Sequence, residues 1–124
     1  MTDLKRARAT NLDPVFHERA RLGICSTLVA HSDGVAFTLL QERCHLTDGN
    51  LNRHLHALVE ERIIETERRT GPGRPQTTVR ITTTGRERFL AYIDALEAIV
   101  RDVHRSASAS ESPMRVVPAR STSQ

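Results

Sequence analysis

The 124-residue sequence predicts one mainly helical α+β domain, in which two short helices joined by a tight turn precede a small β-hairpin and a long C-terminal helix. Three observations support this class. Two capping signals lie nine residues apart, at Thr38 and Thr47. A Gly- and Pro-rich stretch, residues 71–75, separates two strand-like segments. Apolar side chains recur at helical spacing from residue 89 to residue 103.

The first helix is expected to begin at Asp13-Pro14, since Asp is a good N-cap and Pro suits the first helical position. Its wide apolar face predicts burial by several neighbours and includes Phe16, Ala20, Ile24 and Leu28. Residues 32–34, Ser-Asp-Gly, end the helix with a turn.

A second helix is expected after the short segment 35–37, which can pair at the edge of a sheet. Thr38-x-x-Gln41 has the form of a capping box, and the helix should end near Cys44. The connection to the next cap, Thr47, is so short that the pair of helices reads as a helix-turn-helix.

The third helix, about residues 47–61, is expected to have a buried and a polar side. Its inner side carries leucines at helical spacing and also His54. We expect His54 to be a structural residue that bridges this helix and its neighbours, rather than a ligand residue. Its outer side carries groups that can bond base edges, as Asn does with adenine and Arg with guanine. These groups are Asn50, Asn52, Arg53 and His56, with Thr47 at the helix start for a phosphate. A solvated face without a partner is the alternative.

The hairpin is expected to consist of strands 63–70 and 77–81. From residue 68 to residue 80 there are four arginines and no acidic residue, the densest positive patch of the foldable region. Arg68, Arg69 and Arg74 are therefore predicted to contact phosphates or a narrow minor groove. An ordinary solvated loop is the alternative.

The long helix is expected over residues 83–105, with its cap within residues 82–84 and Thr84-x-x-Glu87 as an alternative capping box. Five apolar residues follow a heptad-like spacing of 3, 4, 3 and 4: Phe89, Tyr92, Leu96, Ile99 and Val103. At about 30 Å this helix is longer than a small domain needs for its own core, so we expect these five residues to pack against a second subunit. Folding back on its own domain is the alternative.

The net charge of +3 resides outside the predicted domain, because residues 13–105 hold 13 arginines and 13 acidic residues. Residues 1–12 are expected to be a flexible basic arm, and residues 106–124, rich in Ser, Ala and Pro, a disordered tail. No apolar run has the length of a membrane span and no signal peptide is visible, so a cytoplasmic protein without membrane contact is expected.

Two cysteines, Cys25 and Cys44, lie in predicted helices without metal-ligand spacing, which favours small buried side chains. The six histidines suggest a metal sensor only weakly, since His54 and His56 point to different helix faces. We expect no metal and no cofactor. No catalytic motif is present, so an enzyme is not expected.

The order of elements resembles a winged helix-turn-helix, and the sequence motifs resemble those of the small MarR/ArsR-like winged-helix transcriptional regulators. The likeness covers residues 13–103, and His56 stands where that family commonly has a constant positive charge. The residues that carry it are Leu12-Asp13-Pro14, Arg21-Leu22, Phe37-Thr38, Leu46-Thr47-x-Gly49-x-Leu51-x-x-His54-Leu55-x-x-Leu58, Gly73-Arg74-Pro75 with Thr77-Thr78, and Thr82 with Gly85-Arg86.

This resemblance implies a homodimer that binds pseudo-palindromic double-stranded DNA through paired recognition helices and wings. The predicted organisation is a DNA-binding domain over residues 13–82 followed by a dimerisation helix over residues 83–105. We expect a sequence-specific transcriptional regulator, acting as a repressor, and an unidentified small-molecule effector as a further partner. A winged-helix module that serves only protein contacts is the alternative, against which the wing arginines argue.

Overall fold

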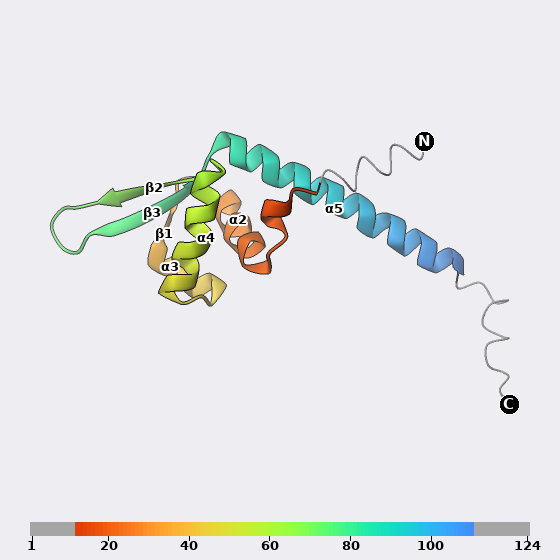
Figure 1. Ribbon diagram of the computed structural model, residues 1–124, viewed down its shortest axis with the longest axis horizontal. Helices are drawn as coiled ribbons and strands as arrows, with labels where there is room; N and C mark the ends of the chain where they lie inside the picture. The colour runs from red at the N-terminus through yellow and green to blue at the C-terminus, as the bar shows by residue number, and fades with distance from the viewer. Residues whose placement is uncertain (1–11, 111–124) are drawn as a thin grey trace, which may run out of the picture.

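The computed structural model describes residues 12–110, and its elements confirm a mainly α fold with a small sheet. Figure 1 shows the three shorter helices packed together, the hairpin projecting at one end and the long helix at the other. The elements are the 3-10 turn η1 (Pro14–Phe16), the helices α2 (Arg19–Ala30), α3 (Phe37–Cys44), α4 (Asp48–Glu60) and α5 (Thr83–Ser110), and the strands β1 (Val35–Ala36), β2 (Ile64–Arg69) and β3 (Gln76–Ile81).

The three strands form an antiparallel sheet in the order β1-β3-β2. The expected edge strand forms, since Val35 pairs with Val79 and Ala36 with Thr78. Gly34, just before it, has a φ of 109°, and an added Cβ would lie 2.7 Å from Cγ2 of Thr78. This left-handed and crowded position requires glycine, so Gly34 allows the chain to enter the sheet.

The expectation that Asp13-Pro14 opens the first long helix is wrong. Asp13 is a cap, since its Oδ1 accepts a hydrogen bond from the N–H of Val15 at 3.3 Å, but it caps only η1. Helix α2 begins at Arg19. The break turns Phe16 into the core, where it is fully buried against two rings of α5. Tertiary packing of one aromatic ring thus overrides the local preference for a continuous helix.

The expected capping box at the start of the second helix is also wrong. Helix α3 begins at Phe37 because β1 runs straight into it, and no side chain caps its start. Thr38 therefore lies inside the first turn. Gln41 instead donates from Nε2 to Oδ1 of Asp48, at the start of α4. The predicted end of α3 at Cys44 is confirmed.

Helix α4 buries the predicted inner side. Leu51 and Leu58 are fully buried and Leu55 nearly so. Arg62, which also fits the spacing of this stripe, lies beyond the helix in a left-handed turn with a φ of 61°. The leucines join α4 to the single core cluster of the described residues, which includes side chains from every helix and strand. The polar side of α4 is thereby turned outward as a direct consequence of packing.

His54 is the one polar side chain buried among the described residues, with an exposure of 3%. Its Nδ1 accepts a hydrogen bond from Nε of Arg21 at 3.2 Å, which identifies a neutral imidazole. Burial lowers the pKa of His54 below its ordinary value. Glu18, whose Oε1 lies 3.6 Å away, opposes this shift, while Arg53 and Arg21 add to it. The predicted structural role of His54 is confirmed.

Helix α5 begins after Thr82, whose Oγ1 accepts the N–H three residues further along at 2.8 Å. The predicted cap within residues 82–84 is confirmed at Thr82. Thr84 and Glu87 lie inside the helix, so the alternative capping box is wrong. The helix continues to Ser110, so residues 106–110 are not part of a disordered tail. The Ser-Ala alternation there contains no helix breaker, and alanine has the highest helix propensity. The expectations for residues 1–11 and 111–124 lie outside the described residues.

Two of the five side chains predicted at a dimer interface belong to the core of their own chain. Phe89 and Tyr92 are 3% and 5% exposed, and their ring centroids lie 5.2 and 5.4 Å from that of Phe16. The turn η1 packs against both rings, so within this chain they contribute to the core rather than to an exposed face. The other three lie further along α5, which leaves the domain toward its C-terminal end (Figure 1). Leu96 is half-buried and still packs against the core, Ile99 is half-buried, and Val103 is 57% exposed.

Substitution of Gly85 by alanine tests the contact between α5 and the end of α4. An added Cβ would lie 2.1 Å from the carbonyl oxygen of Ile63, so the backbones would have to move apart. Gly85→Ala is expected to lower the free energy of unfolding by about 1–3 kcal/mol or more. Urea denaturation measures this. Gly49→Ala is the matched control, because an added Cβ there meets nothing within 4 Å. A loss no larger than that of the control would contradict the contact.

The buried imidazole predicts a pH dependence of stability. Because the pKa of His54 is lower in the folded chain, the unfolded chain binds the proton more tightly and acid favours unfolding. The free energy of unfolding should be highest above the ordinary value of 6.5 and fall as the pH decreases through it toward the folded-state pKa. Urea denaturation across this range should give a flatter profile for His54→Gln. Parallel profiles for the two proteins would assign the pH dependence elsewhere.

Candidate nucleic-acid interface

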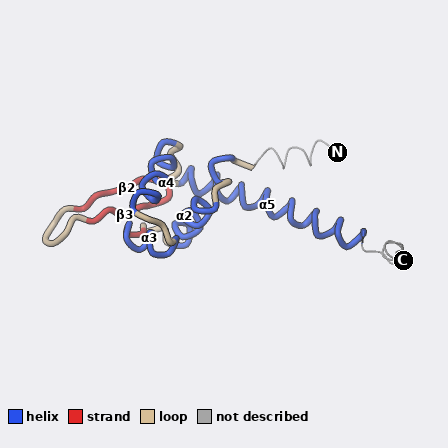
Figure 2. Tube along the Cα trace, turned by 60° about the horizontal axis from the view of Figure 1, so that its bottom comes forward, coloured by secondary structure: helices blue, strands red, loops and turns tan. Residues whose placement is uncertain are grey.

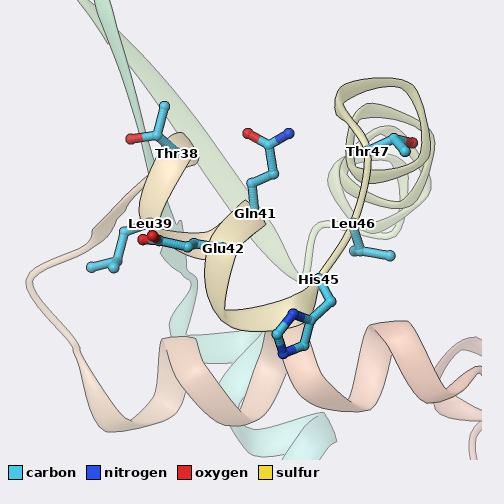
Figure 3. Close-up of a pocket in the computed structure, with 7 residues that line it drawn as sticks. All are labelled: Thr38, Leu39, Gln41, Glu42, His45, Leu46 and Thr47. Atoms are coloured by element: carbon cyan, nitrogen blue, oxygen red, sulfur yellow. The ribbon is translucent and has the colours of Figure 1, made fainter.

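The helix-turn-helix is closed by a single left-handed residue. His45 ends α3 with a φ of 55°, and its N–H bonds the carbonyls of Gln41 and Glu42. The next N–H, of Leu46, also bonds the carbonyl of Gln41, at 3.1 Å. Histidine tolerates this backbone conformation better than most side chains. Figure 3 shows the resulting turn, in which α3 and the start of α4 line one open hollow.

The polar side of α4 is exposed, as the sequence predicts. Thr47 caps the helix, since its Oγ1 accepts the N–H of Asn50 at 3.2 Å. Asn50, Asn52, Arg53 and His56 all lie on the solvent side. A helix N-terminus directs free N–H groups and a positive dipole end outward, which suits a phosphate. The structure thus brings the predicted base-reading residues together on one exposed helix face.

The contacts among these side chains are weak and exposed. Nη2 of Arg53 donates to Oδ1 of Asn50 at 3.4 Å. Nε2 of His56 lies 3.5 Å from Oε2 of Glu60, and both side chains are at least 70% exposed. Exposed pairs of this kind contribute little free energy. The side chains can therefore change partners without a large cost when another surface approaches.

A groove of about 470 Å³ separates α4 from the wing, the hairpin β2–β3. Asn52 and His56 line it from α4, while Thr66, Arg68 and Thr77 line it from the wing. The apolar part of its lining consists of Phe37, Leu55 and Val59. Thr66 and Thr77 were not among the predicted site residues. The alternation of side chains along β2 could have identified Thr66, because it places Thr66 on the same face as Arg68. Thr77 is on the other strand, and only the register places it opposite Arg68.

The two neighbouring arginines of β2 point to opposite faces of the wing. Arg68 pairs with Thr77 in the register and shares the face that lines the groove. Arg69 pairs with Gln76 on the other face. That face also carries Glu67, whose Oε1 lies 3.4 Å from Nη2 of Arg80. The two arginines therefore do not present their charges to the same side.

The positive patch of the wing is smaller than the sequence suggests. Arg80 is paired with Glu67 across the strands, so its charge is partly compensated. Arg68, Arg69 and Arg74 are exposed and form no ion pair within residues 12–110. Arg74 lies in the loop between β2 and β3. Figure 1 shows this loop at the outer end of the wing. Figure 2 confirms from a second direction that the wing and the distal half of α5 lie at opposite ends.

The cysteines are free thiols on the inner side of the helices. Cys25 is fully buried, and burial raises the pKa of its thiol to about 12. Cys44 is half-buried, and burial raises its pKa as well. Such thiols are poor nucleophiles and poor metal ligands. Among residues 12–110, no three His, Cys, Asp or Glu side chains are grouped as they would be around a metal ion.

Within the described part of the chain, no helix combines the length and apolar character that crossing a bilayer requires. Helix α5 has the length, but charged residues recur along it. Its apolar side chains follow one face, and the beginning of that face packs against the core.

Comparison with known proteins agrees with this architecture. An uncharacterized protein of Methanocaldococcus jannaschii is 44% identical over 79 residues, which span 64% of this chain and 85% of that protein. The transcriptional regulator homologue protein of Pyrococcus horikoshii OT3 is 27% identical, with a TM-score of 0.68 over 73% of this chain and 89% of that chain. The MepR protein of S. aureus, in a structure with DNA, is 15% identical, with a TM-score of 0.63 over 89% of each chain, and shows a shared fold.

Residues 20–100 match the family model of the winged helix DNA-binding domain, which thus covers α2 to α5 and the whole candidate interface. Together with the structural likeness to transcriptional regulators, this match confirms the resemblance to MarR/ArsR-like winged-helix regulators. The chain belongs to the winged helix DNA-binding domain family.

Proposed function

We propose that this protein is a sequence-specific, double-stranded DNA-binding transcriptional regulator that acts as a homodimeric repressor. The observation that carries the proposal is the position of two independent elements on one side of the molecule. Asn52 and His56, from the polar face of α4, and Arg68, from the wing, line the same groove. Side chains suited to bases and side chains suited to phosphates therefore face one partner.

In this proposal α4 enters the major groove, whose width of about 12 Å admits a helix. Asn50, Asn52, Arg53 and His56 reach base edges, and Thr47 holds a phosphate at the helix N-terminus. The groove beside α4 then receives one sugar-phosphate strand, with Arg68 and the two threonines as donors. Arg74, at the tip of the wing, contacts the minor groove or its phosphates.

The proposed dimer forms through the distal half of α5. Ile99 and Val103 lie beyond the part of the helix that packs on its own core, and Val100 and Val103 are 44% and 57% exposed. Burial of such a stripe against a second copy is favourable. Two copies would present two recognition helices to a pseudo-palindromic site, and a dimer that covers such a site blocks other proteins from it. A small-molecule effector remains part of the proposal.

Selection from a randomised duplex pool, followed by titration at two salt concentrations, tests the function. A regulator should enrich one pseudo-palindromic sequence and bind it about 10³-fold or more tightly than random duplex, with a steep salt dependence. The length of the selected site reports on the dimer, since two half-sites lie about one helical turn apart. Equal, weak binding to all duplexes, or none at low salt, would overturn the proposal and favour a protein-contact module.

Three arginine variants separate base contacts from phosphate contacts. Arg53→Ala should cost about 1–3 kcal/mol on the selected site and relax the sequence preference. Arg68→Ala should weaken binding to selected and random duplexes alike and reduce the salt dependence by about one counterion. Arg69→Ala, one residue away on the opposite face of the wing, is the matched control and should have a smaller effect than Arg68→Ala. Equal losses for Arg68→Ala and Arg69→Ala would contradict the assigned faces.

A further inference from the structure

The start of α5 holds the end of the recognition helix α4 through direct backbone contacts. Oγ1 of Thr82 donates a hydrogen bond to the carbonyl of Arg62 at 2.8 Å and lies 3.1 Å from that of Ile63. The N–H of Thr82 donates to the carbonyl of Ile63 at 2.9 Å. Gly85 lies so close to the same carbonyl that no side chain fits between them. The two backbones are therefore fixed to each other at this point.

Arg88 extends this grip to two further segments. Its Nε and Nη2 donate to Oδ2 of Asp13 at 3.0 and 2.7 Å. Its Nη1 donates to the carbonyl of Glu61 at 3.1 Å, and Nη2 also contacts Oε1 of Glu61 at 3.2 Å. One guanidinium thus joins the cap of η1, the end of α4 and α5. A cation is also favourable at the C-terminal end of a helix, where carbonyls lack helical partners.

Arg88 is half-buried, with 31% of its side chain exposed, and its partners Asp13 and Glu61 are 24% and 50% exposed. Burial alone would lower the pKa of Arg88, but its hydrogen bonds and the charges of both carboxylates raise it. The guanidinium therefore stays charged. Its planar fork can bond groups in several directions at once, which a lysine ammonium on a flexible stem does less well.

Thr82, Gly85 and Arg88 are spaced by three residues and lie along one side of the first two turns of α5. All three contact residues 61–63, the segment that directly follows the recognition helix. The direction of α5 and the orientation of α4 are therefore coupled. By contrast, the base-reading residues lie toward the other end of α4 and have only weak contacts of their own.

A small tilt of α4 at this junction would move the base-reading side chains by more than the length of a hydrogen bond can vary. Asn52 lies nine residues before Glu61, which corresponds to about 13 Å of helix. A tilt of about 10° at the held end would move Asn52 by roughly 2 Å, whereas productive hydrogen bonds to a base vary by only about 0.5 Å. Leu51, Leu55 and Leu58 also hold α4 against the core, so the junction controls the remaining tilt at its end, and that tilt is enlarged toward the bases.

We propose that Arg88 is a positioning residue for DNA recognition, which sets the orientation of the recognition helix without touching DNA. The proposal rests on the proposed function. It assigns to Arg88 a contribution to sequence discrimination and none to charge-driven attraction, because its own charge is neutralised by two carboxylates. Through the same contacts, a change in the direction of α5 would change the orientation of the recognition helix.

The test compares Arg88→Gln with Arg86→Gln in the full chain, by titration of the selected duplex and of a random duplex. Both variants lose one positive charge from α5, but Arg86 is exposed and its side chain has no hydrogen bond or ion pair with residues 12–110. Arg88→Gln should lose about tenfold or more on the selected duplex and less than about threefold on the random one. Arg86→Gln should change both by the same small factor. Arg88→Lys, which keeps the charge, should lose discrimination partially.

The outcomes distinguish this inference from the function on which it rests. Thermal unfolding of each variant shows whether it is folded at the assay temperature. If Arg88→Gln is unfolded there, the comparison is made with Arg88→Lys. Unchanged discrimination in a folded Arg88 variant, or equal losses on both duplexes, overturns the positioning role and leaves the regulator intact. A wild-type chain that prefers no duplex overturns the proposed function and this inference with it.

Discussion

The architecture depends on one junction, where the recognition helix ends and the long helix begins. The carbonyl of Ile63 accepts the N–H of Thr82, 19 residues away, and lies against Gly85, so two distant segments are in backbone contact. Everything between them, the whole hairpin, is anchored at this point. Polar backbone groups buried at such a contact are stabilising only when they are paired, and the Thr82 hydroxyl and amide provide that pairing.

Beyond this junction, each element places side chains of different chemistry on its two faces. Helix α4 places leucines and His54 against the core and leaves its amides and guanidinium outside, where they are only weakly engaged. Successive side chains of β2 point to opposite faces of the hairpin, so the neighbouring arginines Arg68 and Arg69 lie on opposite sides of the wing. Because the predicted domain is neutral as a whole, the direction of each charge matters more than the total.

The sequence by itself determined the elements whose signals are local. The cap at Thr47, the leucine stripe of α4, the Gly- and Pro-rich wing loop and the buried imidazole of His54 all follow from spacing and side-chain chemistry, and each forms as predicted. The exposed face of α4 follows as well, since a helix with one buried side must turn the other to solvent. Local rules suffice here because neighbouring residues alone decide these features.

Only the tertiary structure decided the features in which distant residues compete with a local preference. Phe16 interrupts the first helix because burial against Phe89 and Tyr92 stabilises more than a continuous helix does, and the same contact places those two rings in the core of their own chain. The register separates Arg68 from Arg69 and pairs Arg80 with Glu67. The link from Arg88 to Asp13, 75 residues away, leaves no periodic trace in the sequence. Such contacts depend on how whole elements pack, which no local pattern records.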